Sequence, residues 1–191
     1  PAVKYELVDR PLTVRRFEFE ALQVMKLIRE GVLEVYEMVP QAEVSNLINL
    51  ANNSFKIDNK PMDIIQEGEM ESVATALQIG ADAVVIDERT LRLFIEDNKG
   101  MKKLLERRFR RTVVPQPEKM NEFSDKLKKA NIIRSIELIG VAYKQGLLDS
   151  YVPKLKKGKD ILVNSVLWAA KYNGCAVTEH EIEELQQTLL K

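Results

Sequence analysis

The chain has 191 residues, of which 45% are apolar, 30% are charged and 6% are aromatic. This composition excludes a disordered or fibrous protein, because a chain of this length can bury a core without disulfides or a structural metal. The single cysteine fits a reducing compartment. No apolar run reaches the roughly 20 residues of a membrane span and no signal-peptide pattern is visible, so we expect a cytoplasmic protein without membrane contact.

Charge is divided unevenly along the chain although its total is zero. Residues 1–101 carry 11 basic and 18 acidic side chains, a net charge of −7, whereas residues 102–191 carry 18 basic and 11 acidic ones, a net charge of +7. Such an arrangement is compatible with carboxylate chemistry beside a surface that attracts polyanions.

The residue types disfavour several common kinds of site. No two of the eight glycines are closer than six positions, whereas the dinucleotide and P-loop fingerprints need glycines two, three or five apart. Cys175 and His180 are too few for a closed zinc site. His180 lies among acidic residues on an expected solvated helix face, which leaves histidine-assisted nucleophilic catalysis without its base. Carboxylates remain as the groups for chemistry.

In chain order, apolar spacing predicts a helical start and a helix over 14–30 that is closed by Gly31 at its C-cap. The alternating segment 32–39 predicts a strand. Helices are then expected over 44–51, 67–79 and about 88–97, with a polar loop over 52–66, Gly80 as a C-cap and a buried parallel strand over 81–86. The helix–strand–helix order of residues 67–97 is typical of a doubly wound α/β sheet.

The second half of the chain begins with a change in composition. Residues 101–111 are basic, and a candidate strand over 112–114 and the breaker Pro115-Gln-Pro117 follow them. We therefore expect one domain over 1–191 with an internal boundary near 98–118. The remaining helices are expected over 120–130, 132–144, 161–172 and 178–189, which gives a helical, basic C-terminal part.

Five acidic residues form the candidate site, and three of them lie at the ends of expected elements. The five are Glu6, Glu69, Glu71, Asp87 and Glu88. Asp87 directly follows the expected buried strand, where an open α/β sheet binds its ligand, although capping of the next helix explains it as well. Glu69 and Glu71 flank one apolar stripe on opposite sides, so only one of them can face a given crevice. Helical periodicity does not decide which of the two glutamates that is. Converging carboxylates would suit Mg²⁺ or Mn²⁺ and phosphoryl chemistry.

Basic runs in the second half are candidates for phosphate contacts, although each is also explained as a solvated face. The first run contains Lys102, Lys103, Arg107, Arg108, Arg110 and Arg111, and the others are Lys126 with Lys128 and Lys129, and the segment 154–159. Phe109 is the only aromatic residue in the first run. Any contact with RNA would therefore be mostly electrostatic.

Four segments resemble the PIN-like nucleases, in particular an archaeal and bacterial branch related to toxin-type ribonucleases. The start Pro1-Ala-Val-Lys-Tyr-Glu-Leu7 resembles the branch's proline–alanine–valine segment. Gly68-Glu-Met-Glu-Ser-Val-Ala74 resembles its GExE helix start, and Ala81-Asp-Ala-Val-Val-Ile-Asp-Glu-Arg89 resembles its strand that ends in an acid and an arginine. Gly140-Val-Ala-Tyr-Lys-Gln-Gly-Leu-Leu148 resembles its late helix. The order of the segments agrees with that of the family.

The resemblance implies a three-layer α/β/α fold with a parallel sheet, and hydrolysis of single-stranded RNA with Mg²⁺ or Mn²⁺. It assigns catalysis and metal binding to Glu6, Glu71 and Asp87, with Glu69 as a reserve metal ligand. It also implies a homodimer and an antitoxin-like protein partner. The family's first strand, which ends in a metal-binding aspartate, has no counterpart in this sequence, and this favours an alternative, a catalytically inactive PIN-like scaffold that binds RNA or a protein.

Overall fold

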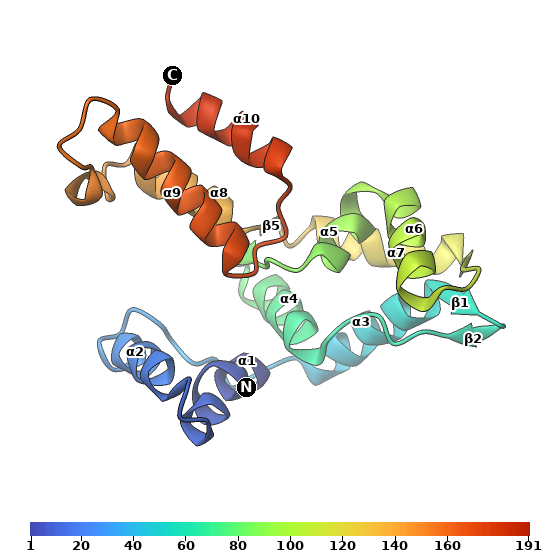
Figure 1. Ribbon diagram of the computed structural model, residues 1–191. Helices are drawn as coiled ribbons and strands as arrows, with labels where there is room; N and C mark the ends of the chain where they lie inside the picture. Colours follow the sequence, from blue (N-terminus) through green and yellow to red (C-terminus); the bar gives the residue numbers. More distant parts are fainter. The chain divides into compact units, whose positions relative to one another are not determined.

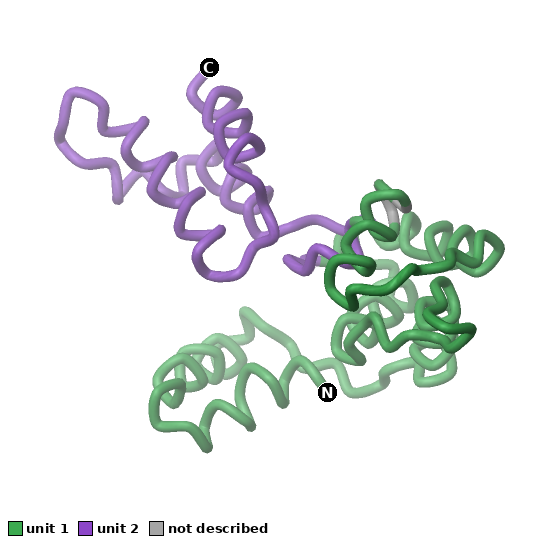
Figure 2. The backbone as a smooth tube through the Cα atoms, turned by 45° about the vertical axis from the view of Figure 1, so that its right-hand side comes forward, with its two compact units in different colours: residues 1–84, 93–130 green, residues 85–92, 131–191 purple. Residues whose placement is uncertain are grey.

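The computed structural model describes residues 1–94, 97 and 99–191. It divides the chain into two compact units (Figure 2). Unit 1 contains residues 1–84 and 93–130, and unit 2 contains residues 85–92 and 131–191. Each unit therefore consists of two separate stretches of the sequence.

Helices make up most of unit 1 (Figure 1). They are α1 (Ala2–Lys4), the π-helical segment η1 (Tyr5–Asp9), the 3₁₀ turn η2 (Pro11–Thr13), α2 (Glu18–Arg29), α3 (Gln41–Asn53), α4 (Glu67–Ile79), α6 (Asn98–Phe109) and α7 (Pro117–Lys128). Its strands are β1 (Phe55–Ile57), β2 (Lys60–Pro61) and β4 (Val114–Pro115). Two further elements, β3 (Val84–Val85) and α5 (Arg89–Glu96), span boundaries between the units.

Aromatic side chains form the centre of the core of unit 1. The ring of Phe94 lies 5.6 Å from that of Phe55 and 4.8 Å from that of Phe123, the latter in an edge-to-face arrangement. All three side chains are fully buried. Aromatic pairs at these separations add to the gain from burial. The Ser124 hydroxyl donates a hydrogen bond of 2.6 Å to the carbonyl oxygen of Phe94, which satisfies both buried groups.

A three-stranded antiparallel sheet flanks this core, in the order β2-β1-β4. Lys56 pairs with Pro61 on one side and with Val114 on the other. The turn between β1 and β2 consists of Asp58 and Asn59, which have φ angles of 51° and 62°. Two consecutive left-handed residues are what a two-residue hairpin turn requires, and Asp and Asn tolerate them better than most residues.

Unit 2 is a small helical body with its own core. Its helices α8 (Ser135–Lys144), α9 (Gly158–Tyr172) and α10 (Glu179–Leu189) contact one another, and the 3₁₀ turn η3 (Asp149–Tyr151) lies between α8 and α9. The buried residues that form its core cluster are Ile136, Val163, Leu167, Ala170, Cys175, Val177, Ile182 and Leu189. Strand β3 pairs with β5 (Ile132–Ile133) in a short parallel sheet, and the next amide, that of Ile86, donates to the Ile133 carbonyl oxygen at 2.8 Å.

The expected three-layer α/β/α fold with a parallel sheet is wrong. The structure is 62% helical, and its sheets are a three-stranded antiparallel one and a two-stranded parallel one. The run over 81–86 forms only the two-residue strand β3, in which Val85 is 48% exposed. A central parallel strand is buried on both faces, and this segment is not.

Two smaller predictions about strands are also wrong. Residues 34–40 form no regular element, and Met38 within them is 74% exposed. The expected loop over 52–66 contains the β1–β2 hairpin. Whether each segment forms a strand depends on a partner strand to pair with, and the alternation of apolar and polar residues within the segment does not reveal such a partner.

Most helix predictions are confirmed, and α4 has the predicted bounds. Gly80 ends α4 with a φ angle of 65°, and Gly31 follows α2 with a φ angle of 71°, so both glycines adopt the left-handed conformation of a helix C-terminus. Within the part of the chain that the structure describes, no helix combines the length and the apolar character that crossing a membrane requires. The internal boundary expected near 98–118 stays a prediction.

Candidate functional site

Two of the predicted acidic residues lie where the start of the chain contacts α4. Glu71, in the second turn of α4, is 6% exposed, and its Oε2 atom accepts a hydrogen bond of 2.7 Å from the backbone N–H of Ala2. Glu6 lies on η1, with Oε1 3.7 Å from the position that a Cβ atom on Gly68 would occupy. A Cβ atom on Gly68 would make ordinary van der Waals contacts with Ala2, Val3 and Glu6, so α1 and η1 pack directly against this turn of α4.

Glu69 lies on another side of α4 from Glu71. The two residues are separated by about 200° around the helix axis, as the sequence indicates. Glu69 is half-buried, whereas Glu71 is buried. Of the two, Glu71 is the one whose carboxylate shares the α1–α4 contact with Glu6.

Asp87 belongs to unit 2, where it joins backbone segments that are distant in sequence. Its Oδ1 atom accepts a hydrogen bond of 2.8 Å from the backbone N–H of Ser135, the first residue of α8. Its carbonyl oxygen accepts another, of 3.0 Å, from the N–H of Ala176. Asp87 therefore satisfies one of the free amides at the start of α8 and places a negative charge at the positive end of that helix.

The helix that directly follows Asp87 is capped by its neighbour Glu88. The Glu88 carboxylate accepts a hydrogen bond from the Thr90 backbone N–H, one of 2.7 Å from the Thr90 hydroxyl and one of 3.3 Å from the Leu91 N–H. Asp87 was considered as a cap for the helix that follows it in sequence. In the structure Glu88 caps that helix, α5, whereas Asp87 caps α8, which lies further along the chain.

A buried thiol lies beside Asp87. Cys175 is 3% exposed, and burial together with a hydrogen bond to Asp87 raises the pKa of its thiol. A thiol with a raised pKa is a poor nucleophile at neutral pH. Cys175 thus belongs to the core of unit 2.

The predicted acids therefore occupy two distinct surroundings. Glu6 and Glu71 share a contact in unit 1, and Asp87 lies in unit 2. Among the residues that the structure describes, no group of three or more His, Cys, Asp and Glu side chains is arranged to hold a metal ion. The assignment of catalysis and of Mg²⁺ or Mn²⁺ to these acids stays a prediction.

Helix α6 carries the predicted basic run and presents most of it to solvent. Met101 and Leu105 are buried on one side of the helix. Lys103 and Arg107, four residues apart on the other side, are exposed. Arg110 is also exposed and ends the helix in a left-handed conformation, with a φ angle of 53°. Within the described residues, none of these three cations has an ion pair.

The other members of the run have partners. Lys102 lies 3.7 Å from Glu106 one turn further along α6, and Arg111 forms an ion pair with Asp58 in the β1–β2 turn. The Arg108 guanidinium lies 5.7 Å from the centre of the Phe109 ring, and Phe109 is 40% exposed. The surface thus combines free cations with one accessible aromatic ring.

The remaining basic runs differ from α6. In the run that follows Asp125, Lys126 donates a hydrogen bond of 2.7 Å to Glu43 on α3, which holds the pKa of Glu43 below its usual value. Lys128 lies 3.4 Å from Asp125. The lysines of the segment 154–159 are exposed in unit 2. Of the three predicted runs, that on α6 places two cations without an ion pair among the described residues, Lys103 and Arg107, on the exposed side of one helix whose other side is buried.

Unit 2 contains an ionic network that sequence reasoning missed. Arg134 donates to Glu137 at 3.0 Å, to Glu181 at 2.9 Å and to the Ala176 carbonyl oxygen at 3.2 Å, and Arg92 donates to Glu181 at 2.8 Å. Burial opposes the charge on Arg134, but its bonds to Glu137 and Glu181 raise its pKa. Thr178 and Glu181 form a capping box, a pattern that the spacing of the two residues already contains.

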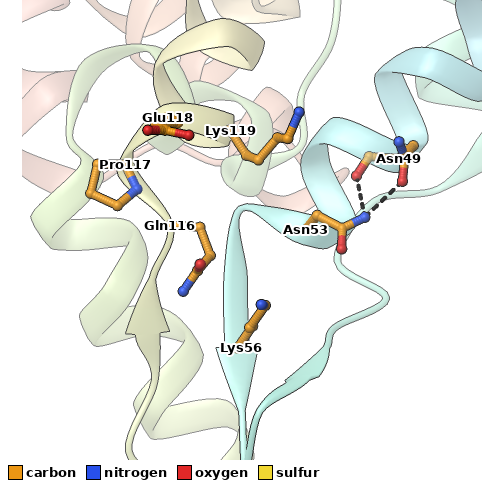
Figure 3. A pocket seen from close by; sticks show the side chains of 7 residues that line it. All are labelled: Asn49, Asn53, Lys56, Gln116, Pro117, Glu118 and Lys119. Atoms are coloured by element: carbon orange, nitrogen blue, oxygen red, sulfur yellow. Dashed lines mark hydrogen bonds between the residues drawn. The ribbon is translucent and has the colours of Figure 1, made fainter.

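Sequence reasoning also missed a pocket in unit 1, between the end of α3, β1 and the start of α7. Its volume is about 780 Å³. It is lined by Asn49, Asn53, Lys56, Gln116, Pro117, Glu118 and Lys119 (Figure 3). These residues carry no sequence motif, since three separate segments supply them.

No family model matches the chain, and neither a curated protein nor a solved structure is significantly similar to it.

Proposed function

We propose that this chain binds RNA through the exposed basic face of α6. The face is defined here by Lys103, Arg107 and Arg110. The observation that carries the proposal is that these three cations are exposed and have no ion pair among the described residues, while the opposite side of α6 is buried through Met101 and Leu105. Unpaired cations on a firmly packed helix are available to neutralise phosphates without first breaking an internal ion pair.

Two features favour a nucleic acid over a small anion. Lys99, at the start of the helix, extends the row of exposed basic residues toward Arg107 over about 12 Å, at a rise of 1.5 Å per residue. That length suits several phosphates of one strand rather than a single anion. In addition, Phe109 offers an exposed ring beside Arg108, on which an unpaired base can stack.

The test measures the affinity of a fluorescently labelled single-stranded RNA as a function of KCl concentration. The triple variant Lys103→Ala, Arg107→Ala, Arg110→Ala removes three phosphate contacts, so the slope of log K against log salt should become shallower by about 2 and the affinity near 0.1 M salt should fall at least tenfold. The matched control, Lys154→Ala, Lys156→Ala, Lys159→Ala, removes the same charge from unit 2 and should change binding much less. Equal losses in the two variants would refute the role of α6.

A second candidate function is hydrolysis of the bound RNA with Mg²⁺ or Mn²⁺. One observation favours it, namely that the buried carboxylate of Glu71 shares the α1–α4 contact with Glu6. A buried acid at a contact with a second acidic residue is a candidate for a functional site, and Glu71 Oε2 already has a cationic neighbour, the Pro1 amino nitrogen at 3.4 Å. A bound divalent ion would supply an activated water and neutralise charge on the phosphodiester.

The variant Glu71→Gln tests hydrolysis separately from binding, because the glutamine oxygen can still accept the bond from Ala2. Loss of Mn²⁺-dependent cleavage with unchanged RNA affinity is the expected result. RNA binding without cleavage by the unaltered chain would restrict the function to binding. Neither candidate requires a second copy or an antitoxin-like partner, and both partners stay predictions.

A further inference from the structure

The pocket between α3, β1 and α7 has walls that are fixed by the backbone. The Gln116 N–H donates a hydrogen bond of 2.8 Å to the Ser54 carbonyl oxygen and so joins the start of α7 to the end of α3. Phe55 pairs with Pro115 across β1 and β4. Ser54 and Phe55, which stand in sequence between the lining residues Asn53 and Lys56, are fully buried, so the backbone that carries these two side chains is anchored in the core of unit 1. The shape of the pocket therefore does not depend on mobile side chains alone.

The charges around the pocket favour an anion. Lys56 and Lys119 are its cations, and Glu118 is its only acid. Within the described residues Lys56 has no ion pair, and Lys119 has only a 3.5 Å contact with Glu122, in which both side chains are about half exposed. Such a surface pair is weak, so the Lys119 ammonium is available to a ligand.

The amide side chains of the pocket retain unused hydrogen-bonding groups. Asn53 Nδ2 donates to the carbonyl oxygen of Asn49 at 2.8 Å and to its Oδ1 atom at 2.7 Å (Figure 3). Asn53 therefore keeps its Oδ1 acceptor, and Asn49 keeps its Nδ2 donors. Gln116 donates through Nε2 to the Pro115 carbonyl oxygen at 3.2 Å and keeps Oε1. Donors and acceptors side by side match the edge of a nucleobase.

We propose that this pocket binds a nucleoside 5′-monophosphate, either free or as the 5′ end of an RNA strand. Lys56 and Lys119 would hold the phosphate, and Asn49, Asn53 and Gln116 would face the base. The volume of about 780 Å³ lies within the range of small-molecule sites and is ample for one nucleotide. For an RNA end the inference rests on the proposed function, whereas for a free nucleotide it does not.

Calorimetric titration of the full chain tests the pocket with four probes: adenosine and uridine 5′-monophosphates, ribose 5-phosphate and inorganic phosphate. We expect dissociation constants for the nucleotides of about 1 mM or lower and clearly weaker binding of the two probes that lack a base. Equal binding of ribose 5-phosphate and the nucleotides would contradict contact with the base. Absence of nucleotide binding up to about 10 mM would overturn the proposal.

Variants assign the binding to the pocket. Lys56→Ala with Lys119→Ala should weaken nucleotide binding about tenfold or more, because it removes both cations. The matched control Lys154→Ala with Lys156→Ala, two exposed lysines of unit 2 outside the pocket and the α6 face, should leave nucleotide binding unchanged. A loss in the control that equals the loss in the pocket variant would show that the nucleotide binds elsewhere and overturn the proposal.

Two RNA strands of identical sequence, one with a 5′-phosphate and one with a 5′-hydroxyl group, distinguish between a free nucleotide and the 5′ end of an RNA strand as the ligand of the pocket. Tighter binding of the phosphorylated strand that disappears in the pocket variant would identify the RNA end as the ligand. Equal affinity of the two strands, together with binding of free nucleotides, would identify a free nucleotide. Because the α6 variant reports RNA binding independently, failure of the pocket and failure of the proposed function give different results.

Discussion

The carboxylate of Glu181 should make unit 2 sensitive to acid. Burial opposes its ionisation, but hydrogen bonds from the N–H and hydroxyl of Thr178 and from Arg92 and Arg134 outweigh burial and lower its pKa to about 2, from an ordinary value of 4.5. The folded state therefore binds a proton more weakly than the unfolded state. The contribution of the Glu181 carboxylate to the stability of the folded state is complete above about pH 5 and is lost as the pH falls through 4.5 toward 2.

The size of this effect follows from the difference in pKa. A shift of about 2.5 pH units corresponds to about 3 kcal/mol, of which about 2 kcal/mol should be lost between pH 6 and pH 3. The side chain of Glu181 is 27% exposed, so water screens part of the interaction and this figure is an upper bound. Glu181→Gln should abolish this part of the pH dependence and destabilise unit 2 at neutral pH.

Trp168 provides a selective assay, because it is the only tryptophan of the chain and lies on α9 in unit 2. Urea unfolding followed by its fluorescence at pH 6, 4.5 and 3 gives the free energy of unfolding of this unit. Glu184→Gln is the matched control, since Glu184 lies on the same helix, its side chain is 65% exposed, and this side chain forms a 3.6 Å pair with His180. If Glu181→Gln kept the pH dependence of the unaltered chain, the network would not stabilise unit 2 and the reasoning would be refuted.

Two further predictions concern single residues. The Cys175 thiol is buried and has a raised pKa, so it should react with a disulfide reagent at pH 8 far more slowly in the folded chain than in urea, and fast reaction of the folded chain would contradict its place in the core. Gly80→Ala should destabilise unit 1 by about 1 kcal/mol, because alanine is strained at a φ angle of 65° although no atom lies within 4 Å of its Cβ atom. Gly80→Asn should cost less, and thermal unfolding of both variants at one pH provides the comparison.

Helices could be predicted from the sequence where apolar spacing and a terminal residue agree. Residues 67–79 show this, because the stripe through Met70, Val73 and Ala74 and the left-handed Gly80 are local features. Strands could not be predicted in the same way. The turn residues Asp58 and Asn59 were the available signal for the hairpin that the sequence analysis assigned to a loop, since such a pair suits two consecutive left-handed positions.

The candidate site was less accessible to sequence reasoning than the helices. The cations of the basic run could be named in advance from composition alone, whereas α6, the helix that carries them, was not predicted. The partners of the acids could not be named, because Glu71 binds Ala2 across 69 residues and Asp87 binds Ser135 across 48 residues. Contacts at such separations depend on tertiary packing, and neither residue type nor spacing encodes them.

The interleaving of the two units has a practical consequence for fragments of this protein. Residues 131–191 carry the three helices of unit 2 but lack Asp87, which caps α8, and Arg92, which bonds Glu181. Expressed by itself, that piece would start α8 with an unsatisfied amide and would leave Glu181 with one guanidinium instead of two. Adding residues 85–92 as a separate peptide should restore both interactions, so complementation in trans would reveal how strongly those eight residues support the C-terminal helices.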